Sequence, residues 1–319
     1  MPEPLLSIRD FCVDYVTERG AVRAVDALDL DVMPGEILGI AGESGSGKST
    51  LAQALLRTLP PPAVISRGRA LFEGRDLTTL SESELQQVRW RRLSMVFQSA
   101  MDALNPVLTI GEQLTDVIRA HERVTAAEAT RRAGTLLERV GISGDRLRSY
   151  AHQLSGGMRQ RVGIALALAL EPSLVILDEP TTALDVIVER EILEQIRALQ
   201  REHRFAVLFI THDLARMLEF SDRVAVFYAA RLVEVGPSAA IAESPSHPYT
   251  QGLLRAFPRV HAVRGDLASI PGSPPSLSSP PPGCRFHPRC AVATDACRGD
   301  RPALREVRPG HWAACPIAK

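Results

Sequence analysis

The sequence lacks an excess of charge of either sign. It holds 37 Lys and Arg residues against 37 Asp and Glu residues, and no block of like charge appears. A protein that binds nucleic acid through its phosphates needs a surplus of basic side chains. The composition therefore gives no support to nucleic-acid binding, and we expect no nucleic acid among the partners.

Long apolar runs are also missing. The longest run, residues 162–170, is far shorter than the roughly 20 residues that a membrane-spanning helix needs. Residues 1–6 lack the basic region and the apolar stretch of a secretory signal. Association with a membrane is therefore expected only through partner proteins. The 319 residues, 45% of them hydrophobic, suffice for a full core and a second module.

The clearest motif is a glycine-rich loop between a strand and a helix. The buried-strand pattern of residues 36–41 runs into Gly42-Glu43-Ser44-Gly45-Ser46-Gly47-Lys48-Ser49-Thr50, and an apolar helix face follows. This is GxxxxGK[ST] in the strand, loop and helix context that phosphate binding requires. The glycines let backbone amides point at phosphate oxygens, Lys48 reaches the β- and γ-phosphates, and the Ser49 hydroxyl ligates Mg²⁺. The motif predicts binding of a nucleotide such as ATP with Mg²⁺.

Two adjacent carboxylates end a second apolar strand. Residues 174–177 have the composition of a parallel strand and lead into Asp178 and Glu179. Ligands of open α/β sheets bind at the carboxyl ends of the strands, so both acids are expected near the phosphates. We expect Asp178 on the Mg²⁺ side and Glu179 beside the attacking water. Taken alone, two solvated acids that end a strand would give the same pattern.

A further phosphate-binding element is predicted at Ser155. This residue is a good N-cap, and Gly156 and Gly157 leave backbone N–H groups unshielded at the start of a helix. A helix N-terminus with bare amides is an anion site. An ordinary capped helix after a glycine-rich turn is the alternative for these three residues by themselves.

Together these segments resemble the ATP-binding cassette (ABC) ATPases. Residues 154–161, LSGGMRQR, resemble the ABC signature, and residues 181–185, TTALD, resemble the loop that crosses the ABC dimer interface. The resemblance implies an α/β fold, with a P-loop NTPase core of ABC type, an N-terminal antiparallel β subdomain and a helical insertion. It also implies that Ser155, Gly156 and Gly157 bind the γ-phosphate of a nucleotide held by a second ATPase subunit.

Three further positions match this family in order and spacing. Gln98 resembles the glutamine that contacts Mg²⁺ and water, and His212 resembles the histidine that contacts the γ-phosphate. The resemblance thus adds Gln98 and His212 to Glu179 as catalytic residues, and Gln98 as a further Mg²⁺ ligand. Tyr15 stands where the family places an aromatic ring that stacks on adenine. The alternative for Tyr15 is a core position, which is commoner for an aromatic residue in an N-terminal strand.

Two segments narrow the type of ABC protein. Residues 98–114 resemble the same region in the ATPase subunits of bacterial oligopeptide and dipeptide importers, and residues 246–250, SHPYT, resemble the HPY segment that opens their C-terminal extension. The resemblance implies an ATPase subunit that drives peptide uptake, peripheral at the cytoplasmic face of the inner membrane. The implied partners are a second ATPase subunit, either a paralogue or a copy, two transmembrane permease subunits and an extracytoplasmic solute-binding protein. A nickel or other solute importer of this family, and a soluble ABC ATPase outside transport, stay open.

The composition changes from about residue 243. We expect an ABC nucleotide-binding domain over residues 1–242, with its helical subdomain at about 98–165, and a C-terminal extension over residues 243–319. Residues 271–283 are rich in Pro and Ser, which is typical of an extended connector.

Four of the five cysteines fall in this extension, and a reducing cytosol disfavours disulfides between them. Four thiols in a short, loop-rich module indicate a metal site. Zinc is the default for four cysteines, but structural zinc sites usually contain close C-x2-4-C pairs, and none occurs here. The spacing resembles that of the [4Fe-4S] ligands in some peptide-importer ATPases, which predicts a cluster on Cys284, Cys290, Cys297 and Cys315. A Zn²⁺ site and unliganded thiols stay open.

Overall fold

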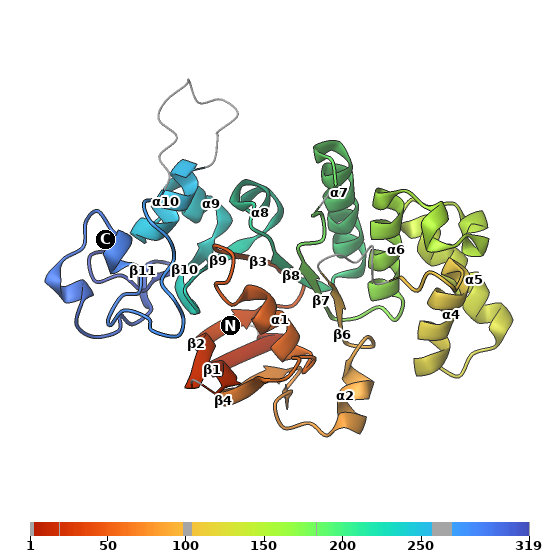
Figure 1. Ribbon diagram of the computed structural model, residues 1–319. Coiled ribbons are helices and arrows are strands. Elements are labelled where there is room, and N and C mark those ends of the chain that lie inside the picture. Colours follow the sequence, from red (N-terminus) through yellow and green to blue (C-terminus); the bar gives the residue numbers. More distant parts are fainter. Residues whose placement is uncertain (1–2, 19, 98–103, 183, 257–269, 319) are drawn as a thin grey trace. The chain divides into compact units, whose positions relative to one another are not determined.

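The computed structural model describes residues 3–18, 20–97, 104–182, 184–256 and 270–318. The chain divides into two compact units, one of residues 1–79 and 209–319 and one of residues 80–208 (Figure 1). Strand β8 (Ala206–Ile210) runs across the boundary between them.

An antiparallel sheet opens the first unit. Its strands are β1 (Leu6–Thr17), β2 (Gly20–Val32), β4 (Ala63–Phe72) and β5 (Arg75–Asp76), in the order β2-β1-β4-β5. Leu6 and Ile8 are fully buried and alternate with more exposed residues, as expected for a strand with one face on a core. The predicted N-terminal antiparallel subdomain is confirmed.

The same unit holds the strands that support the phosphate-binding loop. β3 (Ile37–Ala41) is parallel to β9 (Arg223–Tyr228), and β10 (Arg231–Pro237) is antiparallel to β9. Every residue of β3 is buried, as in a strand covered on both faces. β12 (His311–Ala313) pairs with β10, and β11 (Arg305–Arg308) pairs with β12. The C-terminal extension therefore adds two strands to this sheet, which no sequence pattern had predicted.

The described residues of the first unit also form four short α-helices: α1 (Lys48–Leu55), α8 (Leu214–Phe220), α9 (Ser238–Glu243) and α10 (Pro248–Ala256). α8 packs closely on β3, since a Cβ at Gly39 would lie 2.4 Å from Cγ of Met217. The Pro- and Ser-rich residues 271–283 contain no helix or strand. The predicted domain boundary between residues 242 and 243 falls in the last turn of α9 and stays a prediction.

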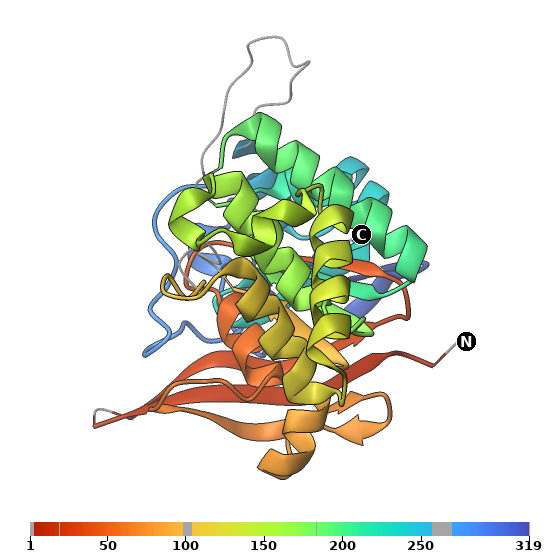
Figure 2. The same cartoon turned by 90° about the vertical axis from the view of Figure 1, so that its right-hand side faces the viewer.

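Helices dominate the second unit. The α-helices among its described residues are α2 (Glu82–Val88), α4 (Ile110–His121), α5 (Ala126–Arg139), α6 (Gly156–Leu168) and α7 (Val186–His203). α4 and α5 pack side by side (Figure 2). The buried residues of α4 are Ile110, Leu114 and Ile118, four apart along one face. A parallel pair of strands, β6 (Leu93–Val96) and β7 (Leu174–Asp178), completes the unit.

No helix in the described part of the chain is long and apolar enough to cross a membrane.

Candidate functional site

The glycine-rich loop joins β3 to α1, as its motif predicts. Gly42, Gly45 and Gly47 have φ angles of 152°, 74° and 102°, which side chains rarely adopt. A Cβ at Gly42 would lie 2.3 Å from the carbonyl oxygen of Phe227, and a Cβ at Gly47 would lie 2.0 Å from that of Ala24. A residue with a side chain would be strained at either position and would collide with a backbone carbonyl oxygen, so both positions require glycine.

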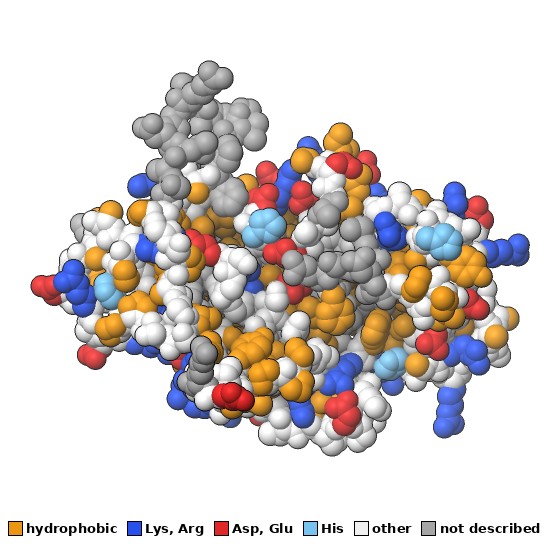
Figure 3. All heavy atoms as spheres, viewed as in Figure 1, with side chains coloured by type: hydrophobic (Ala, Val, Ile, Leu, Met, Phe, Trp, Pro, Cys, Tyr) orange, Lys and Arg blue, Asp and Glu red, His pale blue; other side chains and the backbone are white. Residues whose placement is uncertain are grey.

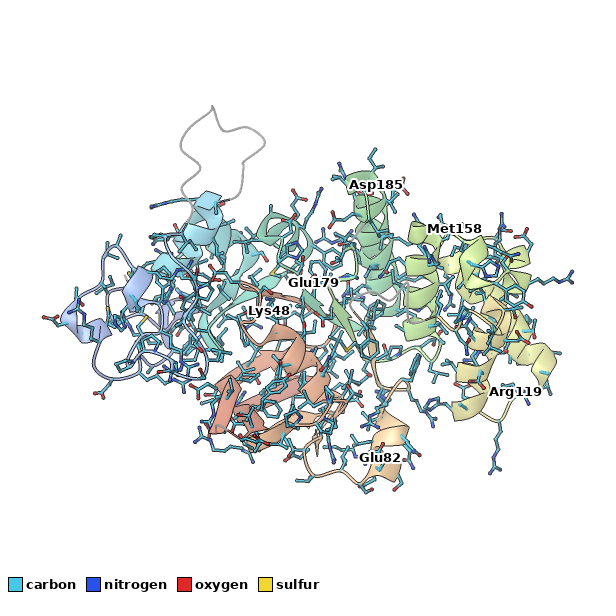
Figure 4. All side chains as sticks on the ribbon, in the orientation of Figure 1. Lys48, Glu82, Arg119, Met158, Glu179 and Asp185 are labelled. Carbon is cyan, nitrogen blue, oxygen red and sulfur yellow. The ribbon has the colours of Figure 1, made fainter. Side chains whose placement is uncertain are left out.

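Lys48 is the first residue of α1, and its side chain turns back over the loop (Figure 4). The ammonium group donates to the carbonyl oxygens of Gly42 at 2.8 Å and Glu43 at 2.9 Å, and to the hydroxyl of Ser46 at 3.3 Å. Lys48 is 6% exposed. A buried cation beside the N-terminus of a helix favours an anion at this place.

His212 and the loop line one cavity. This cavity of about 300 Å³ is walled by residues that include Gly42, Glu43, His212, Leu214 and Leu253. His212 is exposed and follows β8 after one residue. The next residue, Asp213, caps α8 by accepting the backbone N–H of Arg216 at 3.0 Å, which fixes the turn that carries His212. The first unit thus brings together two parts of the predicted site.

Tyr15 lies near the same loop. Its hydroxyl is 3.4 Å from the hydroxyl of Thr50, the last residue of the motif. Tyr15 is half-buried, and the next residue, Val16, is 54% exposed. Figure 3 shows hydrophobic side chains at the surface over the N-terminal strands. The ring is therefore outside the core, where it can receive a base, and its stacking role stays a prediction.

The paired carboxylates end β7 in the second unit. Asp178 is 2% exposed, and the next residue, Glu179, which is labelled in Figure 4, is half-buried. Glu179 has a φ of 47°, an uncommon value for a residue with a side chain. The hydroxyl of Thr182 donates to Oε2 of Glu179 at 2.9 Å, so the direction of this carboxylate is fixed from the following turn.

The signature segment begins α6 in the second unit. Ser155 is the N-cap and accepts the backbone N–H of Met158 at 3.3 Å. A Cβ at Gly157 would lie 2.8 Å from Cγ1 of Val188 in α7. Asp185 caps α7 by accepting the N–H of Val188 at 3.0 Å. The N-terminal ends of α6 and α7 are therefore in contact. Figure 4 labels Met158 in the first turn of α6 and Asp185 at the N-cap of α7. Gln98 lies outside the described residues.

Two family models match the chain. Residues 25–182 match the ABC transporter model, and residues 233–297 match the model described as oligopeptide/dipeptide transporter, C-terminal region. The chain is 45% identical to the dipeptide transport ATP-binding protein DppD of Bacillus subtilis (strain 168), over 98% of this chain and 94% of the relative. It is 43% identical to the oligopeptide transport ATP-binding protein OppD of the same organism, over 97% of this chain and 87% of the relative. The chain belongs to the ABC transporter ATPase family.

A solved structure agrees with this assignment. The dimeric structure of a post-hydrolysis state of an ATP-binding cassette bound to ADP and Pi matches with a TM-score of 0.66 and 26% identity, over 73% of this chain and 98% of that chain. The α/β fold of ABC type and the ATPase activity expected from the sequence are therefore confirmed, and ATP with Mg²⁺ is the nucleotide that this family uses.

The ABC ATPase gathers its C-terminal cysteines in one module. The backbone N–H of Cys284 donates to the carbonyl oxygen of Cys297 at 2.9 Å. Burial raises the pKa of the Cys284 thiol to about 11, and the thiols of Cys315, Cys297 and Cys290 raise it further. Burial also raises the pKa of Cys290 and of Cys315. Four sulfurs are thus near enough to interact electrostatically.

Metal binding by this module stays a prediction. Among the described residues, no three His, Cys, Asp or Glu side chains are gathered closely enough to hold a metal ion.

Sequence patterns missed two contacts of the phosphate loop. Arg289 of the cysteine module donates to Oε2 of Glu43 at 2.9 Å, and the backbone N–H of Glu43 donates to the hydroxyl of Tyr249 at 3.0 Å. These partners are 246 and 206 residues away along the chain, so no local pattern could have revealed them.

Proposed function

We propose that this ATPase drives the uptake of oligopeptides or dipeptides across the cytoplasmic membrane. The observation that carries the proposal is the match of residues 233–297 to the oligopeptide/dipeptide transporter C-terminal region, beside the cassette match of residues 25–182. Two relatives named for dipeptide and oligopeptide transport align with nearly the whole chain, which supports it. A nickel or other solute importer of the same family and a soluble ABC ATPase outside transport are the alternatives.

Residues 42–50 are assigned to the phosphates of ATP. Their backbone amides and Lys48 would hold the β- and γ-phosphates, and Ser49, Asp178 and Gln98 would ligate Mg²⁺. When bound, Mg²⁺ neutralises charge on the phosphates. The assignment is supported by the buried ammonium of Lys48, which donates to three loop oxygens, those of Gly42, Glu43 and Ser46, that a phosphate could replace.

Glu179 is assigned to the attacking water and His212 to the γ-phosphate. The Thr182 hydroxyl donates to one carboxylate oxygen of Glu179 and fixes the direction of the carboxylate, which is assigned to orient the water or accept its proton. His212 lines a cavity with Gly42 and Glu43, which supports its assignment to the phosphate end of the nucleotide. Tyr15 is assigned to the adenine, and its place beside Thr50 supports that role.

A second ATPase subunit, a paralogue or a copy, is proposed to complete each nucleotide site. Ser155, Gly156 and Gly157 would offer their amides to the nucleotide of that subunit. Val186 is 63% exposed and Ile187 is 73% exposed, and both lie at the start of α7 beside the signature. Two adjacent exposed aliphatic side chains suit a surface that a partner covers.

The permease contacts are proposed on the second unit. Val107 is 75% exposed, Tyr150 is 38% exposed and Leu108 is 36% exposed. The hydrogen bond from the N–H of Ile110 to the carbonyl oxygen of Ser149, at 2.9 Å, holds their two segments together. Two transmembrane permease subunits would seat here and hold the chain at the cytoplasmic face of the membrane. An extracytoplasmic solute-binding protein would deliver the peptide.

The cysteine module is proposed to hold a [4Fe-4S] cluster, with Zn²⁺ as the alternative. In its support, backbone N–H groups donate to the sulfurs of Cys284, Cys290 and Cys315, as they do around thiolate ligands. One Zn²⁺ draws its four sulfurs to about 2.3 Å from a single point. Among the described residues no three possible ligands are gathered closely enough to hold a metal ion, so the choice of the [4Fe-4S] cluster rests on the spacing of the four cysteines.

The decisive experiment uses the complex isolated from the native membrane. Its subunits are identified, and ATP hydrolysis is measured in proteoliposomes with the binding protein loaded with dipeptides, longer peptides or Ni²⁺ complexes. We expect permease subunits in the complex and stimulation by peptides. Stimulation by Ni²⁺ complexes alone would reverse the substrate assignment, and a chain that purifies without permeases would favour a function outside transport.

A further inference from the structure

Glu43 of the phosphate loop is held from the C-terminal extension at two points. Nη1 of Arg289 lies 2.9 Å from Oε2 of Glu43, and the hydroxyl of Tyr249 accepts the backbone N–H of Glu43 at 3.0 Å. The carbonyl oxygen of the same residue accepts the ammonium of Lys48 at 2.9 Å. The C-terminal extension therefore holds Glu43, whose carbonyl oxygen orients Lys48.

Arg289 uses all of its hydrogen-bond donors. Nη1 donates to Glu43 and, at 3.2 Å, to the hydroxyl of Tyr228. Nε and Nη2 donate to the carbonyl oxygens of residues 270–272, at distances from 2.8 to 3.5 Å. The side chain is 8% exposed. Five donors in a planar fork are a property of arginine, and the three donors of a lysine ammonium cannot reproduce them.

Tyr249 is equally constrained. It is fully buried, its ring centroid lies 4.5 Å from that of Tyr228, and it lies 5.4 Å from that of Phe286. Phe286 stands in the cysteine module, two residues after Cys284. The Tyr249 hydroxyl, which accepts the N–H of Glu43, is thus held in place by a packed aromatic cluster and cannot move with the loop.

We propose that Arg289 and Tyr249 are positioning residues that set the affinity of the phosphate loop for ATP by acting through Glu43. The inference rests on the proposed role of residues 42–50. The carboxylate of Glu43 would otherwise repel the phosphates, and the Arg289 guanidinium neutralises it. Tyr249 fixes the backbone that orients Lys48. Because Arg289 directly precedes Cys290, the conformation of the cysteine module sets the geometry of the nucleotide site.

The test compares matched arginine variants of the full chain and of the assembled transporter. Arg289→Ala is expected to raise the Kd and the KM for MgATP about 10-fold and to change kcat by less than about 2-fold. The Kd of Arg289→Lys for MgATP should fall between those of Arg289→Ala and the unmodified protein, because lysine keeps the positive charge but lacks the planar guanidinium group. The control is Arg298→Ala, since Arg298 flanks Cys297 in the same module but its side chain is 64% exposed. The control should bind MgATP normally.

A double variant tests whether Arg289 acts by neutralising the carboxylate of Glu43. Glu43→Gln in the Arg289→Ala background should restore most of the affinity, because no uncompensated carboxylate is left beside the phosphates. Tyr249→Phe keeps the ring and loses only the hydroxyl, and it should raise the Kd about 3-fold. A normal KM for Arg289→Ala, or no recovery in the double variant, would overturn the proposal. Lys48→Ala in the same assay tests the proposed role of residues 42–50 separately from that of Arg289 and Tyr249. If Lys48→Ala binds MgATP normally, the assignment of residues 42–50 to the phosphates of ATP is wrong.

Discussion

Nε2 of His311 lies 2.7 Å from Oε1 of Glu234, and both side chains are buried. The carboxylate of Glu234 also accepts the backbone N–H groups of Ser246 and, at 3.1 Å, of His247. One buried carboxylate therefore joins β10 to β12 and to the residues that precede α10. This contact ties the C-terminal extension to the sheet that carries the phosphate loop.

Glu234→Gln should destabilise the protein markedly. The glutamine side chain keeps the shape of glutamate, but an NH2 group replaces one acceptor oxygen and the negative charge is lost. In the unmodified protein that charge faces two backbone N–H groups and the imidazole of His311. We expect the free energy of unfolding in urea to fall by about 2 to 4 kcal/mol. The matched control is Glu243→Gln at the exposed end of α9, where a change below about 0.5 kcal/mol is expected. Equal stability of the two variants would contradict this role for Glu234.

The pH dependence of stability should carry a contribution from His247. Burial lowers the pKa of His247 to about 4 from its ordinary 6.5, against an opposing effect of Glu234. Between these values the unfolded chain binds a proton that the native chain does not, so stability falls as the pH drops from 6.5 towards 4. The full contribution is about 3 kcal/mol.

Urea unfolding from pH 7 to pH 4 measures this contribution. His247→Asn should show a flatter profile than the unmodified protein, because it removes the titrating group. His152→Asn, at an exposed position, should keep the original slope. Identical profiles for all three proteins would show that His247 does not titrate in this range.

Glu179→Gln should stop turnover while ATP still binds. The glutamine can still accept the Thr182 hydroxyl, but it cannot act as a base towards water. We expect kcat to fall by about 10² to 10⁴ and the Kd for MgATP to change little. Glu171→Gln, whose side chain is 66% exposed in the same unit, serves as the control. Near-normal hydrolysis by the Glu179 variant would remove this residue from its proposed role.

Gly157→Ala should impair the step that needs two subunits. The added Cβ would lie 2.8 Å from Cγ1 of Val188 and would push α7 away from the signature helix. We expect reduced ATP-dependent association of subunits and at least 10-fold slower hydrolysis, with unchanged ATP binding to the single chain. Gly134→Ala is the control, because its Cβ would meet only Cδ1 of Leu147 at 3.8 Å. If the two variants hydrolyse ATP equally, the packing at Gly157 has no bearing on the signature.

The cysteine module should yield iron and sulfide. Protein purified without oxygen is expected to be brown and to contain about four iron and four acid-labile sulfide atoms per chain. Replacing Cys297 with Ser should remove the colour, whereas Cys12→Ser should not, since Cys12 is a buried residue of β1. One zinc per chain without sulfide would establish the alternative.

The local elements followed closely from the sequence. The expected strand at residues 36–41 is β3, the expected strand at residues 174–177 is β7, and the glycine-rich loop joins a strand to a helix. These elements are specified by side chains a few residues apart, through apolar periodicity, capping and backbone conformation. β11 and β12 escaped prediction because they have only four and three residues, and β12 joins the sheet by pairing with β10, which is distant in the sequence.

The sequence by itself determined the membership of the ABC ATPase family and named the residues proposed for the nucleotide site, because the glycine-rich loop, the paired carboxylates and the signature are each contiguous runs that depend on local backbone and residue type. The tertiary structure alone revealed that Arg289 and Tyr249 reach Glu43, and that Glu234 and His311 join the extension to the sheet. Such contacts depend on how distant segments pack, and packing follows from the shape and burial of the whole core and not from any short pattern.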